Sequence, residues 1–172
     1  MQQNVQKDPG AEQHALRSVE RHHAEMLEKL RELVSSLIQA VEGDGGDAEH
    51  SARNALVKWC DSELIPHAVA EEGPLYGGPK KTEEGRLLVE GMLAEHQVII
   101  GLVERLRTAE GVKAAVAGGS IEEIFALHLD KENGLLMPFI ADSRGLSLAE
   151  AVHGLHELTG EAHPHGDYDE RS

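Results

Sequence analysis

Apolar residues recur every three or four positions over most of the chain, which is the pattern of amphipathic helices. Three stretches show it in the ranges of about 13–42, 48–75 and 81–109. A fourth opens at Ser120, where Ser120 and Glu123 form a capping box. The loops between them, EGDGGD, GGPKK and a Gly- and Ala-rich run ending in GGS, are short. Short loops make consecutive helices antiparallel neighbours, so the sequence predicts an all-α, antiparallel up-down four-helix bundle.

Two prolines and a second capping box set further expectations about local geometry. Pro66 lies inside the second helical stretch, which predicts a kink just before His67. Pro138 marks the expected end of the fourth helix, whose inward-facing positions include Leu135. Ser147 with Glu150 begins a short fifth helix that continues to about residue 159. The expected organisation is a flexible N-terminus at 1–12, the bundle at 13–141, an appended helix at 142–160 and a polar, histidine-containing tail at 161–172.

Polar side chains interrupt the apolar stripes of all four predicted bundle helices. These residues are His23, His67, Glu71, His96, His128 and Glu132. Four of them form two His–Glu pairs four residues apart, so each pair shares one helix face. A buried carboxylate without a partner costs several kcal/mol, which favours a cation beside it. All six fall at a similar depth along the predicted bundle, and together they predict a site for two metal ions.

Other polar residues near these positions leave alternatives open. His22 is one step round the helix from His23 and is expected to be solvated or to support a ligand. Glu72 is a rim charge or a spare ligand, and Tyr76 either packs or shapes access to the site. Cys60 is expected in the core. A separate cluster of His153, His156, His163 and His165 lies on the fifth helix and the tail, and a second metal site there stays an alternative to ordinary surface histidines.

Composition and charge limit the classes of partner. The formal net charge of −15 argues against nucleic acid or an anionic membrane, since both bind basic surfaces. No apolar run reaches the ~20 residues of a spanning helix, and the N-terminal MQQNVQKDPG lacks an apolar signal core. The single cysteine excludes an internal disulfide and is typical of a reducing compartment. A cytoplasmic protein, monomeric or homodimeric, is the expectation.

Four segments, in order, give the chain a resemblance to a known family. RHHAEMLEKL, LIPHAVAEEGPLY, AEHQVII and HLDKENGLLMP resemble the hemerythrin-like (HHE cation-binding) family over about residues 14–141. The resemblance implies a four-helix bundle with a non-haem di-iron centre, its two iron ions bridged by an oxo or hydroxo group. It assigns six ligands: His23, His67, Glu71, His96, His128 and Glu132. The small ligand it implies is O2, H2O2 or NO.

One departure from the respiratory hemerythrins bears on function. They carry a second histidine one turn after the third-helix ligand, where this chain has Ile100, and the carboxylate after His128 is Glu132 rather than an aspartate. Counting two octahedral ions against these ligands leaves about one open position per ion. This favours sensing or reaction over simple oxygen carriage. The hypotheses are a di-iron binder or sensor, a di-iron enzyme of catalase-like or oxygenase type, and an iron or zinc storage or structural bundle. Structural zinc is disfavoured because Cys60 is the single thiol.

Overall fold

The computed structural model describes residues 7–43 and 45–159, and every regular element in these residues is a helix. The elements are α1 (Pro9–Glu42), α2 (Asp47–Trp59), the π-helix η1 (Cys60–Leu64), α3 (Ile65–Glu71), the 3-10 helix η2 (Pro79–Lys81), α4 (Glu83–Leu106), α5 (Val112–Lys131), the π-helix η3 (Glu132–Leu136), α6 (Met137–Asp142) and α7 (Leu148–Thr159). The all-α class is confirmed. No helix in the described part of the chain is long and apolar enough to cross a bilayer.

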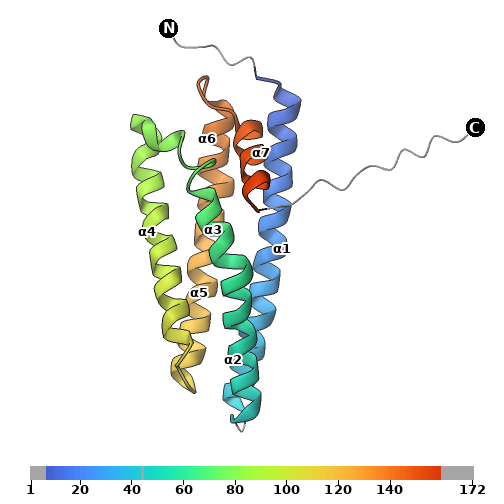
Figure 1. Ribbon diagram of the computed structural model, residues 1–172, viewed down its shortest axis with the longest axis vertical. Helices are drawn as coiled ribbons and strands as arrows, with labels where there is room; N and C mark the ends of the chain where they lie inside the picture. The colour runs from blue at the N-terminus through green and yellow to red at the C-terminus, as the bar shows by residue number, and fades with distance from the viewer. Residues whose placement is uncertain (1–6, 44, 160–172) are drawn as a thin grey trace, which may run out of the picture.

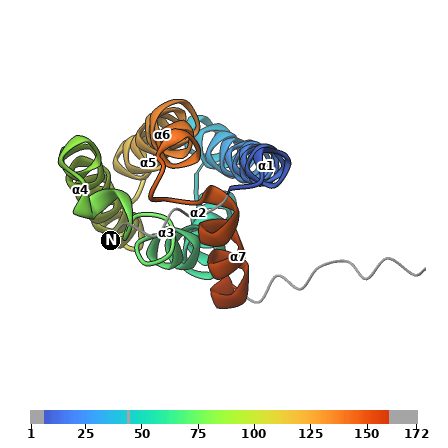
Figure 2. The same ribbon diagram turned by 90° about the horizontal axis from the view of Figure 1, so that it is seen from above.

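Four long segments lie side by side along the long axis of the molecule (Figure 1). They are α1, α2 continued by η1 and α3, α4, and α5 continued by η3 and α6. Figure 2 shows them surrounding a common interior, with α7 added on the outside. α7 packs against α1 and α3 at the end of the bundle where α1 begins.

The first helix begins earlier than the sequence predicted. α1 starts at Pro9, and Asp8 caps it by accepting a hydrogen bond from the Gly10 amide at 2.9 Å. The Lys7 ammonium donates to the carbonyl oxygens of Ile140 and Ala141 at 2.9 and 2.8 Å. Within the expected flexible segment 1–12, the described residues are therefore anchored, while residues 1–6 and the tail at 161–172 lie outside the described residues.

The helix boundaries set by Gly, Ser and Pro signals were in part wrong. α5 begins at Val112, so the Gly- and Ala-rich run is helical and Ser120 does not open the helix. Gly118 is buried there, and a Cβ on it would lie 3.3 Å from the Leu37 side chain, so the small residue permits close packing on α1. The packing of α5 at Gly118 against its neighbours outweighs the low helix propensity of glycine. The fifth helix is as predicted, and the Ser147 hydroxyl accepts from the Glu150 amide at 3.2 Å.

Each segment that carries a His–Glu pair contains a π-helical stretch followed directly by a proline. η1 ends just before Ile65–Pro66, so a local irregularity of the helix falls where the sequence predicted a kink before His67. η3 ends before Met137–Pro138, so Pro138 sits in the first turn of α6 and the segment continues to Asp142 instead of ending. The residues before α3 and α6 keep helical dihedrals, so each segment is continuous, and the wider i→i+5 turn just before each proline is where the hydrogen-bond ladder changes to accommodate a residue without an N–H.

The π-helical stretches also shift which side chains face inward. Leu135 is 55% exposed, and the neighbouring Leu136 is fully buried in its place. An i→i+5 turn rotates the following residues relative to an α-helix, so the inward stripe projected from Ile121 and Phe125 fails beyond Glu132. The second stretch likewise ends at Glu71 rather than at Leu75, which is buried in the following turn.

The buried apolar residues form two clusters with a polar layer between them. The first cluster includes Met26 and Ile99, and the second includes Val19 and Met92. On α1, His23 lies between Val19 and Met26, and on α4 His96 lies between Met92 and Ile99. The polar side chains therefore enter the interior at one level of the bundle.

Candidate metal centre

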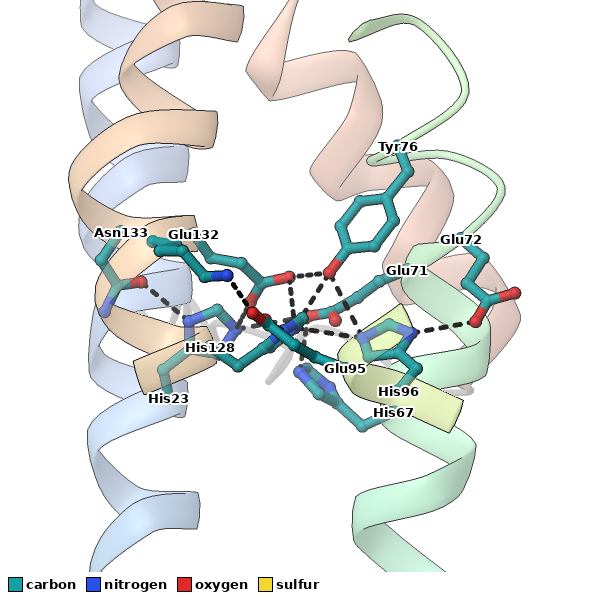
Figure 3. Close-up of polar contacts among 11 residues, drawn as sticks. His23, His67, Glu71, Glu72, Tyr76, Glu95, His96, His128, Glu132 and Asn133 are labelled. Carbon is teal, nitrogen blue, oxygen red and sulfur yellow. Dashed lines mark hydrogen bonds and ion pairs between the residues drawn. The ribbon is translucent and has the colours of Figure 1, made fainter. Parts of the chain in front are cut away.

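All six predicted site residues are buried and converge on one place in the interior (Figure 3). None is more than 6% exposed. They come from every long segment: His23 from α1, His67 and Glu71 from α3, His96 from α4, His128 from α5 and Glu132 from the start of η3. The expectation that these side chains meet at one level is confirmed.

The donor atoms fall into two groups that share one residue. Glu71, His96, His128 and Glu132 offer one group of ligand atoms, and His23, His67 and Glu71 offer the other, with the atoms of each group within 4.8 Å of one another. Glu71 Oε1 lies 2.7 Å from His67 Nε2 and 3.3 Å from His23 Nε2. A carboxylate common to both groups is placed as a bridging ligand of two cations would be.

Glu132 also faces both groups, through different oxygens. Its Oε1 lies 3.3 Å from His128 Nε2, and its Oε2 lies 3.5 Å from His23 Nε2. The two carboxylates therefore sit between histidines that come from opposite sides of the centre.

Three of the four histidines are held from behind by an oxygen. His23 Nδ1 is 2.8 Å from Asn133 Oδ1, His96 Nδ1 is 2.9 Å from Glu72 Oε1, and His128 Nδ1 is 2.9 Å from Glu95 Oε2. An imidazole that donates its Nδ1–H to such an oxygen presents the Nε2 lone pair on the other side. Each Nε2 points into the centre, so these contacts leave the Nε2 atoms as the ones that a metal would bind.

Lys131 adds a charge behind Glu95, to which it is hydrogen-bonded. Burial opposes ionisation of Glu95, but the hydrogen bonds from Lys131 and His128 outweigh it and lower the Glu95 pKa. Glu95 is therefore an ionised acceptor for His128. Glu72, which the sequence left as a rim charge or a spare ligand, instead acts as the acceptor for His96.

The charges of the cluster shift the pKa values of its members in opposite directions. Burial opposes ionisation of Glu71, but the charge of His67 and the hydrogen bond from His23 outweigh it and hold the Glu71 pKa well below its usual range. Burial opposes protonation of His23, yet its hydrogen bond to Glu71 and the charge of Glu132 raise the His23 pKa to about 9. The centre is an anionic pocket that attracts positive charge.

The Tyr76 side chain is part of the centre, whereas the sequence left open whether it packs or shapes access to the site. Its hydroxyl lies 3.0 Å from His128 Nε2 and 3.3 Å from His96 Nε2, and it is hydrogen-bonded to Glu132 Oε1. Burial and the charges of Glu132 and Glu71 raise the pKa of the Tyr76 phenol above its usual range. Tyr76 lies in the turn after α3, where helical periodicity gives no signal; its nearness to Glu71 along the chain was the one available hint.

The residues present fit a metal cofactor by their unsatisfied atoms and by their chemistry. His67 Nε2 and Glu132 Oε2 are buried without a hydrogen-bond partner, and the close contact of His67 with Glu71 lacks hydrogen-bonding geometry. Buried polar atoms of this kind are rare unless a cation or water satisfies them. A set of imidazoles and carboxylates suits a first-row divalent or trivalent ion.

A cavity of about 210 Å³ opens beside the His23–His67 group. Its lining includes His22, Glu63, His67 and Ala70, together with Leu158 from α7. The His22 ring lies 5.1 Å from the His67 ring, which supports His22 as a neighbour of the ligands. The cavity reaches the outer side of the His67 ring, while the His67 Nε2 atom that faces the centre is buried.

Two other sequence features lie apart from the centre. Cys60 is fully buried in the apolar cluster with Met26, and burial raises the pKa of its thiol to about 12, which is that of an unreactive core residue. His153 is exposed and 3.4 Å from Glu157, while His163 and His165 lie outside the described residues. The second metal site therefore stays an open alternative.

Comparison with known proteins agrees with this geometry. A family model described as the hemerythrin HHE cation binding domain matches residues 14–140, from the first turns of α1 to α6. No curated protein and no solved structure matched the chain. The matched region contains every residue of the polar centre. The chain belongs to the hemerythrin HHE cation-binding family.

Proposed function

We propose that the protein is a non-haem di-iron protein that binds, senses or reacts with O2, H2O2 or NO. The ligands are His23, His67, Glu71, His96, His128 and Glu132, held by the up-down four-helix arrangement typical of the family. The observation that carries the proposal is Glu71, which belongs to both groups of donor atoms. A single ion would not need a carboxylate between two separate sets of histidines.

Iron is favoured over structural zinc by the type and number of donors. Structural zinc sites are closed, four-coordinate and commonly rich in cysteine, whereas Cys60 is buried in an apolar cluster away from the centre. Six nitrogen- and oxygen-donating residues around two positions suit ions of higher coordination number. Iron supplies the redox chemistry that O2, peroxide and NO require.

The chain itself contributes orientation, dryness and access. Asn133, Glu72 and Glu95 hold three imidazoles with their Nε2 atoms inward. The apolar clusters above and below the polar layer exclude bulk water, which strengthens electrostatic interactions inside it. The cavity beside His67 admits a small molecule on one side.

The cavity also favours an enzyme as the second candidate. Its volume of about 210 Å³ exceeds the share of several water molecules, so it holds more than one diatomic ligand. Space for substrate and product next to a ligand histidine suits turnover, such as catalase-like or oxygenase chemistry. Storage or a structural role is the third candidate.

Metal loading under anaerobic conditions tests the proposal. About two Fe(II) ions should bind per chain, with His128→Ala lowering this number sharply and the exposed His153→Ala leaving it unchanged. H2O2 added to the loaded protein separates the candidates, since repeated release of O2 indicates an enzyme and a stable optical change indicates a binder or sensor. A colourless protein that takes up zinc but no iron would contradict the proposal.

A further inference from the structure

We propose that Tyr76 is a seventh metal ligand, which coordinates through its phenolate oxygen on the His96–His128 side of the centre. The inference rests on the proposed metal centre and adds a residue to it. It names the donor type that distinguishes this side from the other.

The first support is the geometry of three donor atoms. Tyr76 Oη, His96 Nε2 and His128 Nε2 are separated by 3.3, 3.0 and 3.1 Å, so they form a nearly equilateral triangle. Donors at ~2.1 Å from an octahedral ion lie roughly 3 Å apart when they occupy adjacent positions. The three atoms therefore match one face of an octahedron around a single cation.

The second support is the hydrogen-bond count around the Tyr76 hydroxyl. The Nδ1 atoms of His96 and His128 face Glu72 and Glu95, so the Nε2 atoms of both rings are the ones left to meet the Tyr76 oxygen. The one proton of the hydroxyl is directed to Glu132. The Tyr76 oxygen and the two Nε2 atoms therefore converge on the same space, which a cation bound by all three would fill.

The third support is that the chain holds Tyr76 firmly at this place. Tyr76 is fully buried, and its ring stacks on that of His96 with centroids 5.5 Å apart. The amides of Leu75 and Tyr76 both donate to the Glu71 carbonyl at 3.1 Å, which ties the turn to the end of α3. A Cβ on Gly77 would lie 2.6 Å from the Gly73 carbonyl oxygen, so the turn depends on glycine at that position.

Coordination by Tyr76 also supplies a donor on the side of the centre where α4 offers only His96. Ile100 lies one turn beyond His96 on α4 and offers no ligand atom. Tyr76 reaches the centre from the turn after α3 instead (Figure 3). On binding, the phenol loses its proton to solvent and the oxygen forms the bond to the cation, so the step needs no oxidant or reductant.

The experiment compares the whole protein with Tyr76→Phe, which removes only the hydroxyl, and with Tyr168→Phe, which removes the only other tyrosine of the chain. Addition of Zn(II) or Ga(III) should produce the ultraviolet difference signal of about one tyrosinate per chain in the wild type and in Tyr168→Phe, and none in Tyr76→Phe. With Fe(III), a visible phenolate-to-iron charge-transfer band should follow the same pattern. The reduction potential of Tyr76→Phe should rise, because an anionic oxygen donor stabilises Fe(III).

The outcomes separate this inference from the proposed function. Iron-loaded wild type and Tyr76→Phe with identical visible spectra and potentials would overturn Tyr76 as a ligand and leave a di-iron centre standing. A wild type that gives the tyrosinate signal with zinc but binds no iron would support Tyr76 and overturn the di-iron proposal. Loss of both signals in Tyr168→Phe as well would also overturn the assignment to Tyr76.

Discussion

The two halves of the polar centre are built differently. On the His96–His128 side, a carboxylate stands behind each histidine, Glu72 for His96 and Glu95 for His128, and Tyr76 closes the centre in front. On the other side, His23 is supported by the neutral amide of Asn133, and His67 borders the cavity.

The difference suggests a division of roles between the two ions. A carboxylate behind a histidine makes the imidazole a stronger donor than an amide does, so we expect the ion at His96 and His128 to be held more firmly. The ion at His23 and His67 has weaker support and lies next to the cavity, so we expect it to exchange small ligands. Four predictions test this comparison, from the largest expected effect to the smallest.

The first prediction compares the metal content of two variants: one at Glu71, which both halves share, and one at His67, which belongs to one half. Glu71→Ala should abolish binding of both ions, since each group of donors loses a member. His67→Ala should leave about one ion per chain, on the His96–His128 side. Metal analysis after anaerobic loading measures both. A His67→Ala variant that loses both ions, while His96→Ala keeps one, would reverse the assignment of the firmer half.

The six inward residues were predictable because helix periodicity places them on the apolar stripe at one level. The residues that support them were not. Glu95 lies on a partly exposed surface of an acidic protein, where carboxylates are common and periodicity gives no reason to single it out. Glu72 was noticed only as a rim charge or a spare ligand, because its partner His96 is on another helix. Tyr76 depends on the course of a turn, which no repeating pattern specifies.

The fold was predictable in class but not in its boundaries. Gly118 and Pro138 are residues that commonly end helices. Tight packing keeps Gly118 within a helix, and the π-helical stretch η3 allows the helix to continue past Pro138. The π-helical stretch η3 also sets how the residues beyond Glu132 are rotated about the helix axis. Leu135 was therefore assigned to the buried face, although it is exposed. Local propensity yields to tertiary packing at each of these points.

The second prediction concerns the supporting oxygens. Glu95→Gln should weaken the affinity of the firmer ion by about 10–100-fold, because outer hydrogen bonds of this kind tune ligand basicity. Asn133→Asp should act in the opposite direction on the exchangeable ion by giving His23 a carboxylate. Competition with a chelator measures both affinities. Equal affinities for the two ions in the wild type, unaffected by either change, would remove the basis of the comparison.

The third prediction tests the open approach. Ala70→Trp should fill part of the cavity and slow the binding of azide, a small anionic probe, to the iron-loaded protein by about 10-fold without changing iron content. Val98→Trp is the matched control, since Val98 is an exposed residue of α4 outside the cavity lining. Stopped-flow absorbance measures the rates. If the two variants slowed azide binding equally, the cavity would not be the route.

The fourth and smallest effect concerns α7, which supplies Leu158 to the cavity wall. Buried Glu12 anchors the start of α7 by accepting hydrogen bonds from the Ser147 hydroxyl at 2.6 Å and the Leu148 amide at 2.7 Å. Glu12→Gln removes the charge at a helix N-terminus and should destabilise the docked α7 by about 1 kcal/mol. That raises the undocked fraction by about 5-fold, so azide binding should speed up by no more than this factor.

Hydrogen exchange of the α7 amides is the direct measurement for this variant, and Glu157→Gln, a change at an exposed glutamate near the end of α7, is its control. Faster exchange in Glu12→Gln together with faster azide binding would make α7 the movable wall of the exchangeable half. Faster exchange with an unchanged azide rate would place the limiting barrier closer to the metal, between His22 and His67, whose rings lie 5.1 Å apart. In that case the contrast between the halves would depend on the ligands themselves rather than on the helix that covers them.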